Sequence, residues 1–140
     1  MLDVGDRFPV EKLSVSPDGP AVVFFYPAAL TAGCTMEAKG FNDRYDAFRA
    51  AGYEVIGVST DLTDKNDEFR AECGLDFPLV SDEDASLTNE LDLLKQYGEH
   101  GEFARRVTYL LDSKGIVQRV WDVSDAGEHP EEVLAAVSSL

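Results

Sequence analysis

The chain has 140 residues, of which 44% are hydrophobic and 28% are charged, and these proportions are typical of a folded globular protein rather than a disordered one. The length suits one domain with a hydrophobic core and is short for two, so we expect a single domain over residues 1–140. No apolar run reaches the ~20 residues of a membrane span. The N-terminal residues lack the apolar stretch of a secretory signal, which predicts a cytoplasmic location.

The charge balance is strongly acidic: 27 acidic residues against 12 basic ones give a formal net charge of −15. A surface of this kind repels nucleic acids and anionic lipids, so neither is an expected partner. Two interpretations of the charge stay open. The acidic residues either form a solvated shell that keeps the protein soluble, or they adapt it to high salt, where counterions screen the repulsion.

The first regular element is expected at Ala21–Tyr26, a continuous apolar run of the kind found in strands buried on both faces. A helix is expected to follow from about Thr35 to Ala51. Its apolar residues Phe41, Tyr45 and Phe48 are spaced by four and three positions, which places them in one stripe on the helix.

The rest of the chain alternates between strand and helix patterns. Strands are predicted at 53–59, 77–80, 106–112 and 116–123. Helices are predicted from a cap at Thr63 or Asp64 to Cys73 with Gly74 as its end, from Asp82 or Asp84 to about Leu94, and from Pro130 to about Leu140. The last two strands are close enough to form a hairpin. This order resembles an α/β, thioredoxin-like fold with a central mixed β-sheet flanked by helices.

The segment 27–37 leaves the first strand and enters the first helix, which is where ligands bind in open α/β sheets. If Thr31 is the N-cap, Cys34 lies in the first helical turn, close to unpaired backbone N–H groups and the positive end of the helix dipole. A free thiol has a pKa near 8.5, and the helix terminus contributes only ~1 kcal/mol toward the thiolate. A reactive thiol therefore needs a cation as well. Arg106 is the best candidate, because the strand that it begins should lie beside the first strand. Adjacent Arg105 would point to the opposite face if the strand has begun there.

These residues together resemble a known family. The spacing Pro27-x-x-x-Thr31-x-x-Cys34 resembles the active-site motif of the peroxiredoxins, and residues 33–37 are similar to those of the Q type, also called bacterioferritin comigratory protein. The similarity extends over essentially the whole chain. It implies a thiol-specific peroxidase that reduces hydrogen peroxide and organic hydroperoxides, with a role in antioxidant defence and redox homeostasis.

The resemblance also implies a role for each residue of the motif. Cys34 would be the peroxidatic cysteine, oxidised from thiolate to sulfenic acid. Thr31 would bond the peroxide and the thiolate through its hydroxyl, and Pro27 would shield the site from water. Arg106 would bind the thiolate and the charge that develops on the leaving oxygen, while the N–H groups of Gly33 and Cys34 hold the substrate. A supporting role falls to Glu37, although a glutamate in a first turn commonly serves only to complement the helix dipole.

The second half of the catalytic cycle is less defined by the sequence. Many Q-type relatives carry a resolving cysteine five residues after the first, where this chain has Lys39. Other relatives place it in the next helix, where Cys73 lies about one turn later. Cys73 either resolves the sulfenic acid or packs in the core beside Phe69, four residues earlier on the same face. Resolution would require the Cys34 helix to unwind at its first turn, because a disulfide needs Cα atoms within about 7 Å.

By the same resemblance, the reductant is thioredoxin or a similar thiol, no cofactor or metal is needed, and the protein is a monomer or a weak homodimer. The two cysteines and two histidines of the chain are not spaced as a zinc site.

Other functions fit the sequence less well. A thioredoxin-type oxidoreductase needs Cys-x-x-Cys, which the chain lacks, and a cysteine hydrolase would pair Cys34 with His100 or His129, neither of which lies in a catalytic motif. A receiver-like signalling domain with Asp61 and Asp64 would need an acidic pair after the first strand. A catalytically inactive binding module with the same fold remains an alternative.

Overall fold

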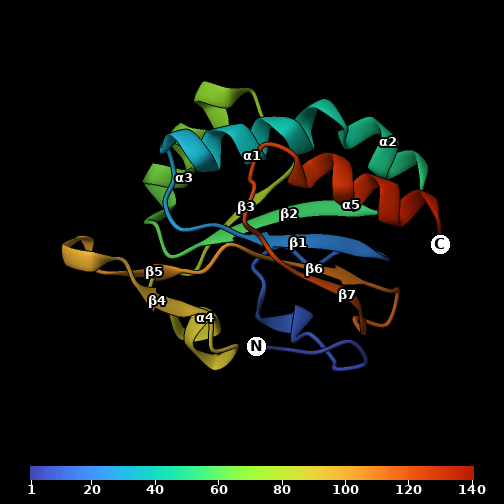
Figure 1. The fold of residues 1–140 in the computed structure, drawn as a ribbon, viewed down its shortest axis with the longest axis horizontal. Helices are drawn as coiled ribbons and strands as arrows, with labels where there is room; N and C mark the ends of the chain where they lie inside the picture. Colours follow the sequence, from blue (N-terminus) through green and yellow to red (C-terminus); the bar gives the residue numbers. More distant parts are fainter.

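The computed structural model describes residues 1–140 and is built around a five-stranded sheet of order β3-β2-β1-β6-β7 (Figure 1). The strands of this sheet are β1 (Ala21–Phe25), β2 (Glu54–Ser59), β3 (Leu79–Ser81), β6 (Val107–Leu111) and β7 (Val117–Asp122). The pairs β1–β2 and β2–β3 are parallel, whereas β1–β6 and β6–β7 are antiparallel. The predicted mixed sheet is confirmed.

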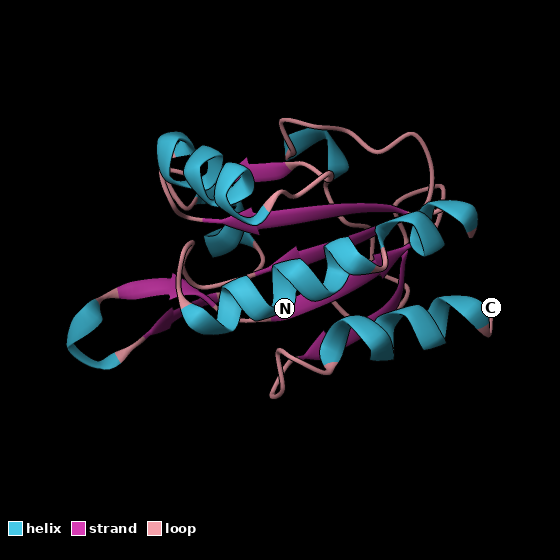
Figure 2. Cartoon of the chain, turned by 90° about the horizontal axis from the view of Figure 1, so that it is seen from above, coloured by secondary structure: helices cyan, strands magenta, loops and turns pink.

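The two faces of the sheet are covered unequally. Four helices lie over one face (Figures 1 and 2): α1 (Ala32–Asp43), α2 (Tyr45–Ala50), α3 (Thr63–Cys73) and α5 (His129–Ser138). The other face is covered by the N-terminal segment with the 3-10 turn η1 (Val10–Lys12) and by the short helix α4 (Ser86–Glu90). Side chains of β1 alternate between the two cores, Val22 and Phe24 toward the four helices and Val23 and Phe25 toward the other face. This burial on both faces explains the continuous apolar run of β1.

The helix expected from Thr35 to Ala51 differs from the structure in two ways. It begins earlier, at Ala32, and it is divided at Arg44 into α1 and α2. The Arg44 backbone leaves the helical region, with φ −108° and ψ 5°, and its guanidinium donates a hydrogen bond of 2.9 Å to the Gly40 carbonyl. The apolar stripe nevertheless faces the core on both sides of the break.

The start of α3 also differs from the prediction. The N-cap position is Leu62, not Thr63 or Asp64. Thr63 is the first helical residue, and its backbone N–H and hydroxyl both donate to one carboxylate oxygen of Glu83, at 2.7 and 2.8 Å. A distant carboxylate therefore satisfies the helix N-terminus, which a local pattern does not show. At the other end, Gly74 has the predicted left-handed conformation, with φ 61°.

After β3, the helix predicted to reach Leu94 is only the five residues of α4. Asp82 does help to begin it, because its carboxylate accepts hydrogen bonds from the N–H groups of Leu87 and Thr88, at 3.2 and 2.7 Å. The chain then forms a hairpin that the sequence did not predict, made of β4 (Leu94–Gln96), the 3-10 turn η2 (Gly98–His100) and β5 (Glu102–Ala104). Strands of three residues are too short to show a period.

The end of the chain follows the prediction. The hairpin β6–β7 turns at Gly115, whose φ of 78° favours glycine, and α5 carries Pro130 in its first turn. Gly40 of α1 packs against Pro130, where a Cβ would come within 2.7 Å of the proline ring, so the two helices approach closely. None of the helices is both long and apolar enough to cross a bilayer.

Candidate active site

Cys34 is the third residue of α1, whose N-cap is Thr31. The first backbone hydrogen bond of the helix runs from the Thr35 N–H to the Thr31 carbonyl, at 2.9 Å. The N–H groups of Gly33 and Cys34 precede it, so they have no partner within the helix and lie at its positive end. The cysteine is 1% exposed, which removes its sulfur from bulk water while leaving these donors beside it.

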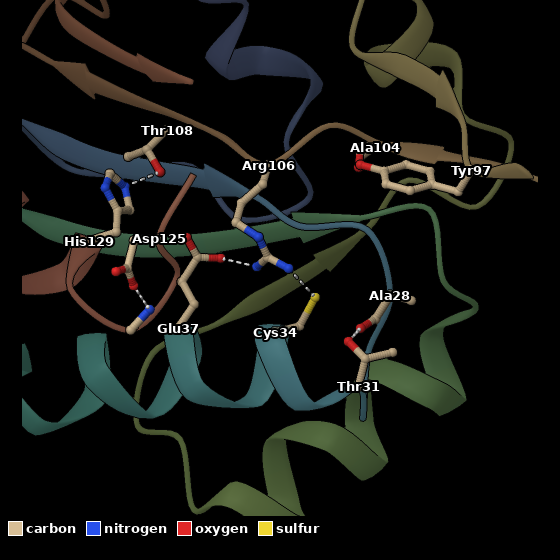
Figure 3. A network of polar contacts seen from close by, with 11 residues as sticks. Ala28, Thr31, Cys34, Glu37, Tyr97, Ala104, Arg106, Thr108, Asp125 and His129 are labelled. Carbon is tan, nitrogen blue, oxygen red and sulfur yellow. Dashed lines mark hydrogen bonds and ion pairs between the residues drawn. The ribbon is translucent and has the colours of Figure 1, made fainter. Parts of the chain in front are cut away.

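Arg106 joins Cys34 to the sheet (Figure 3). Its guanidinium donates one hydrogen bond to the Cys34 sulfur, Nη2 to Sγ at 3.3 Å, and one to Glu37, Nη1 to Oε1 at 2.7 Å. Arg106 immediately precedes β6, and β6 runs antiparallel to β1, so the start of β6 lies beside the end of β1 and the start of α1. The neighbouring Arg105 instead pairs with Asp122 at 2.6 Å. Of the two arginines, only Arg106 bonds the sulfur.

Glu37 is fully buried, and one of its carboxylate oxygens, Oε2, has no hydrogen-bond partner. Burial raises the pKa of Glu37 to about 7, against the opposing effect of the Arg106 guanidinium. The alternative in which Glu37 sits in the first turn and complements the helix dipole is wrong, because that turn holds no acidic residue. It lies in the second turn of α1, on the same face as Cys34 three residues earlier, and forms a buried ion pair with Arg106.

The loop between β1 and α1 carries the other motif residues. The Thr31 hydroxyl donates to the Ala28 carbonyl at 2.8 Å, within the loop rather than toward the Cys34 sulfur (Figure 3). Pro27 is half-buried at the end of β1. Asp61, which the sequence suggested only as a receiver-type acid, accepts a hydrogen bond of 2.7 Å from the Ala29 N–H. Sequence reasoning missed this contact, which joins residues 32 positions apart.

Cys73 is the last residue of α3, half-buried against the core under the four helices, and both cysteines are free. The end of α3 is bonded to the end of α1: the Asn42 side chain donates to the Gly74 carbonyl at 3.1 Å and accepts from the Asp76 N–H at 2.8 Å. Asn42 follows Cys34 by eight residues, or ~12 Å along the helix axis. The structure thus keeps the segment that follows Cys73 at the opposite end of α1 from Cys34.

His129 does not contact Cys34. Its ring lies in the core between Phe41 and Trp121, with Nε2 2.8 Å from the Thr108 hydroxyl and Nδ1 3.0 Å from a Glu132 carboxylate oxygen. Burial lowers the pKa of His129, which favours the neutral ring. The other histidine, His100, is exposed in η2. No histidine is therefore placed as the base of a cysteine hydrolase.

Residues 6–120 match the model of the AhpC/TSA family. The chain belongs to this family. The chain is 38% identical over 121 residues to peroxiredoxin Bcp of Xanthomonas campestris, with 84% of this chain and 76% of the relative covered. It is also 38% identical over 130 residues to the chloroplastic peroxiredoxin Q of Sedum lineare, with 92% of this chain and 69% of that one covered.

Solved structures of the same type superpose closely on this peroxiredoxin. A mutant of the Xylella fastidiosa PrxQ aligns with a TM-score of 0.90 at 27% identity, covering 99% of this chain and 97% of that one. Peroxiredoxin Q of Xanthomonas campestris aligns with a TM-score of 0.80 at 35% identity, covering 87% and 79%. The thioredoxin-like fold expected from the sequence is confirmed, and the chain is a thiol peroxidase of the peroxiredoxin Q/Bcp type.

Proposed function

We propose that Cys34 is the peroxidatic cysteine of this thiol peroxidase and that Arg106 activates it. The observation that carries the proposal is the 3.3 Å hydrogen bond from Arg106 to the Cys34 sulfur at the N-terminus of α1. A guanidinium and a helix terminus both favour the thiolate over the thiol, and the thiolate is the nucleophilic form. A cysteine that served only for packing would need neither.

In the proposed reaction, the Cys34 thiolate attacks one oxygen of a hydrogen peroxide or organic hydroperoxide molecule. A sulfur–oxygen bond forms and the oxygen–oxygen bond breaks, so sulfur is oxidised to sulfenic acid and the peroxide is reduced by two electrons. The electron pair of the broken bond leaves with the second oxygen, which takes a proton and departs as water or an alcohol. Arg106 and the free N–H groups of Gly33 and Cys34 stabilise the charge on that oxygen.

Thr31 and Pro27 complete the proposed substrate site. The Thr31 hydroxyl rotates from the Ala28 carbonyl toward the bound peroxide, where it bonds an oxygen of the substrate. Such hydrogen bonds are commonly tightened only once the substrate is present. Pro27, at the end of β1, limits the access of water, and Glu37 holds the second nitrogen of the Arg106 guanidinium and so fixes its direction.

We further propose that Cys73 resolves the sulfenic acid. Its thiolate attacks the Cys34 sulfur, a disulfide forms, the sulfur–oxygen bond breaks, and the hydroxide released takes up a proton to become water. Thioredoxin or another dithiol then reduces the disulfide. The first turn of α1 must unwind for the two Cα atoms to come within about 7 Å. A monomer or weak homodimer stays a prediction. A cytoplasmic location also stays a prediction, since the relatives include chloroplastic peroxiredoxins.

The test compares peroxide consumption by wild type, Cys34→Ser and Cys73→Ser, with dithiothreitol or thioredoxin as reductant. Cys34→Ser should lose turnover with both reductants, whereas Cys73→Ser should keep it with dithiothreitol and lose it with thioredoxin. Mass spectrometry after one equivalent of peroxide should show a Cys34–Cys73 disulfide in the wild type. Wild-type turnover no faster than that of Cys34→Ser would refute the peroxidatic role. A stable sulfenic acid with Cys73 free would refute resolution by Cys73 and indicate an external thiol.

A further inference from the structure

A buried polar network lies at the carboxyl ends of the parallel strands, beneath the loop that leads to Cys34. Asn66 of α3 is at its centre. It accepts a hydrogen bond of 2.5 Å from the Tyr26 hydroxyl and donates to the hydroxyls of Ser59 and Ser81, at 3.0 and 2.7 Å. Tyr26, Ser59 and Asn66 are each no more than 2% exposed. The network therefore ties α3 to the ends of β1, β2 and β3.

Asp61 extends this network to the active-site loop. A single carboxylate oxygen, Oδ2, accepts hydrogen bonds from the Ser59 hydroxyl at 2.8 Å and from the Ala29 N–H at 2.7 Å. The Ser59 hydroxyl also accepts from the Asp61 N–H at 3.3 Å, so the carboxylate is held in place by its own turn. Hydrogen bonds to a charged acceptor are among the strong ones, and this one joins the rigid end of β2 to the loop.

The loop that Asp61 holds has an unfavourable backbone conformation. Leu30, next to Ala29, has φ 66°, in the left-handed region that side-chain-bearing residues rarely adopt. Such a conformation persists only where the surroundings enforce it. The residue that follows is Thr31, the N-cap of α1, so the position of Ala29 and Leu30 determines where the Thr31 hydroxyl and the first turn of the helix lie.

We propose that Asp61 is a positioning residue for the peroxidase reaction, whose carboxylate holds the Ala28–Leu30 loop and so fixes where Thr31 and the first turn of α1 lie relative to Cys34. This inference rests on the proposed function of Cys34. Asp61 does not touch the sulfur. It acts on the geometry of the peroxide site, and the Arg106 contact with Cys34 comes from a different part of the molecule.

Two reactions of the same cysteine test the proposal. Oxidation by hydrogen peroxide requires both the thiolate and the substrate site that the loop forms, whereas alkylation by iodoacetamide requires only the thiolate. The variants are Asp61→Ala, Asp61→Asn and, as a matched control, Asp64→Asn, which removes the same charge from an exposed position nearby. Thermal unfolding of each variant shows whether it is folded at the assay temperature.

Asp61→Ala should slow the reaction of Cys34 with peroxide by roughly tenfold to a hundredfold, the range expected when reacting groups are displaced by about 1 Å. Its alkylation rate should not fall by more than about twofold. Asp61→Asn should recover part of the peroxide rate because its side-chain oxygen accepts the Ala29 N–H, and Asp64→Asn should equal the wild type.

Peroxide oxidation of Asp61→Ala at the wild-type rate would overturn the proposal, as would an equal loss of oxidation and alkylation. The first result would show that the loop keeps its geometry without the carboxylate, and the second that Asp61 acts on the thiol itself. Neither result bears on the proposed role of Cys34, which is refuted only if wild type and Cys34→Ser consume peroxide equally slowly. The two proposals can therefore fail independently.

Discussion

Two buried polar clusters lie under the helices that cover one face of the sheet, and they are built on opposite plans. The side chains of Tyr26, Ser59, Asn66 and Ser81 are uncharged and meet a carboxylate, that of Asp61, only at Ser59. The carbonyl oxygen and the amide nitrogen of Asn66 both have partners among them. The cluster of Cys34, Glu37 and Arg106 is charged and incompletely bonded, with one Glu37 oxygen left without a partner.

The difference separates stability from reactivity. A buried network whose members are all satisfied strengthens its own hydrogen bonds in the low dielectric of the core, and it specifies how α3 packs on the sheet. A buried charge cluster with an unsatisfied oxygen costs stability, so it persists where its chemistry is required. We therefore expect mutations in the first cluster to change mainly the free energy of unfolding, and mutations in the second to change mainly the reaction of Cys34.

The largest effect is expected for Arg106→Gln, which removes the only side chain that bonds the Cys34 sulfur. Loss of one donor to a developing oxyanion commonly slows a reaction by about 10²–10³-fold, and we expect the rate of Cys34 oxidation by peroxide to fall by that factor. Rapid mixing with hydrogen peroxide, followed by acid quench and mass spectrometry, measures this rate.

Arg105→Gln is the matched control for this variant. Arg105 is adjacent in sequence, carries the same charge and pairs with Asp122 near the surface. It should oxidise within about twofold of the wild-type rate. Equal losses in the two variants would mean that the net positive charge near β6 matters and that the geometry of the Arg106 contact does not.

The next largest effect is expected for Asn66→Leu. The leucine has a similar volume but leaves the buried Tyr26 hydroxyl unsatisfied, which costs about 1–3 kcal/mol. Ser59 keeps its bonds to Asp61, so Ser59 and half-exposed Ser81 each lose only one hydrogen bond, at about 1 kcal/mol each. We expect the free energy of unfolding in urea to fall by about 3 kcal/mol in total. Asn42→Leu, at the surface end of α1, should cost no more than about 1 kcal/mol. Similar losses for both would show that the buried network adds nothing beyond an ordinary surface contact.

The sequence predicted those features that depend on local patterns. The apolar run of β1, the stripe of Phe41 and Phe48, the glycine that ends α3 and the proline at the start of α5 all follow from residues within a few positions of one another. The position of Cys34 in the first turn of α1 was likewise predictable, because it depends only on Thr31 being the N-cap. The sequence also predicted Arg106 as the cation near Cys34, because the strand that it begins was expected to lie beside the first strand, as β6 does beside β1.

Features that depend on contacts between distant residues were not predictable in this way. The α3 N-terminus is satisfied by Glu83, 20 residues away, and the active-site loop is held by Asp61, 32 residues from its partner. Sequence reasoning assigned Glu37 a supporting role but did not predict its burial or its ion pair with Arg106, 69 residues away. The β4–β5 hairpin was missed because neither strand is long enough for a repeating pattern.

The smallest effect is expected in the pH dependence of stability, which involves Glu37 of the charged cluster and no residue of the uncharged one. Burial raises the pKa of Glu37 from 4.5 to about 7, so between these values the folded protein holds a proton that the unfolded chain has released. Stability is then lost as the pH rises through this window, because the buried carboxyl must ionise. Glu37→Gln cannot ionise and should lose this dependence, so the stability of the variant relative to wild type should rise by about 2 kcal/mol between about pH 5 and about pH 7.

Urea unfolding of wild type, Glu37→Gln and the exposed control Glu72→Gln over this pH range measures the difference. The lowered pKa of His129 has the opposite sign, because its stability contribution is lost as the pH falls below 6.5. That contribution is common to all three proteins and cancels in the comparison. Parallel curves for wild type and Glu37→Gln would show that Glu37 stays ionised beside Arg106 throughout. The burial of Glu37 would then not lower the free energy of unfolding at neutral pH, and the charged cluster would not differ from the uncharged one in its effect on stability.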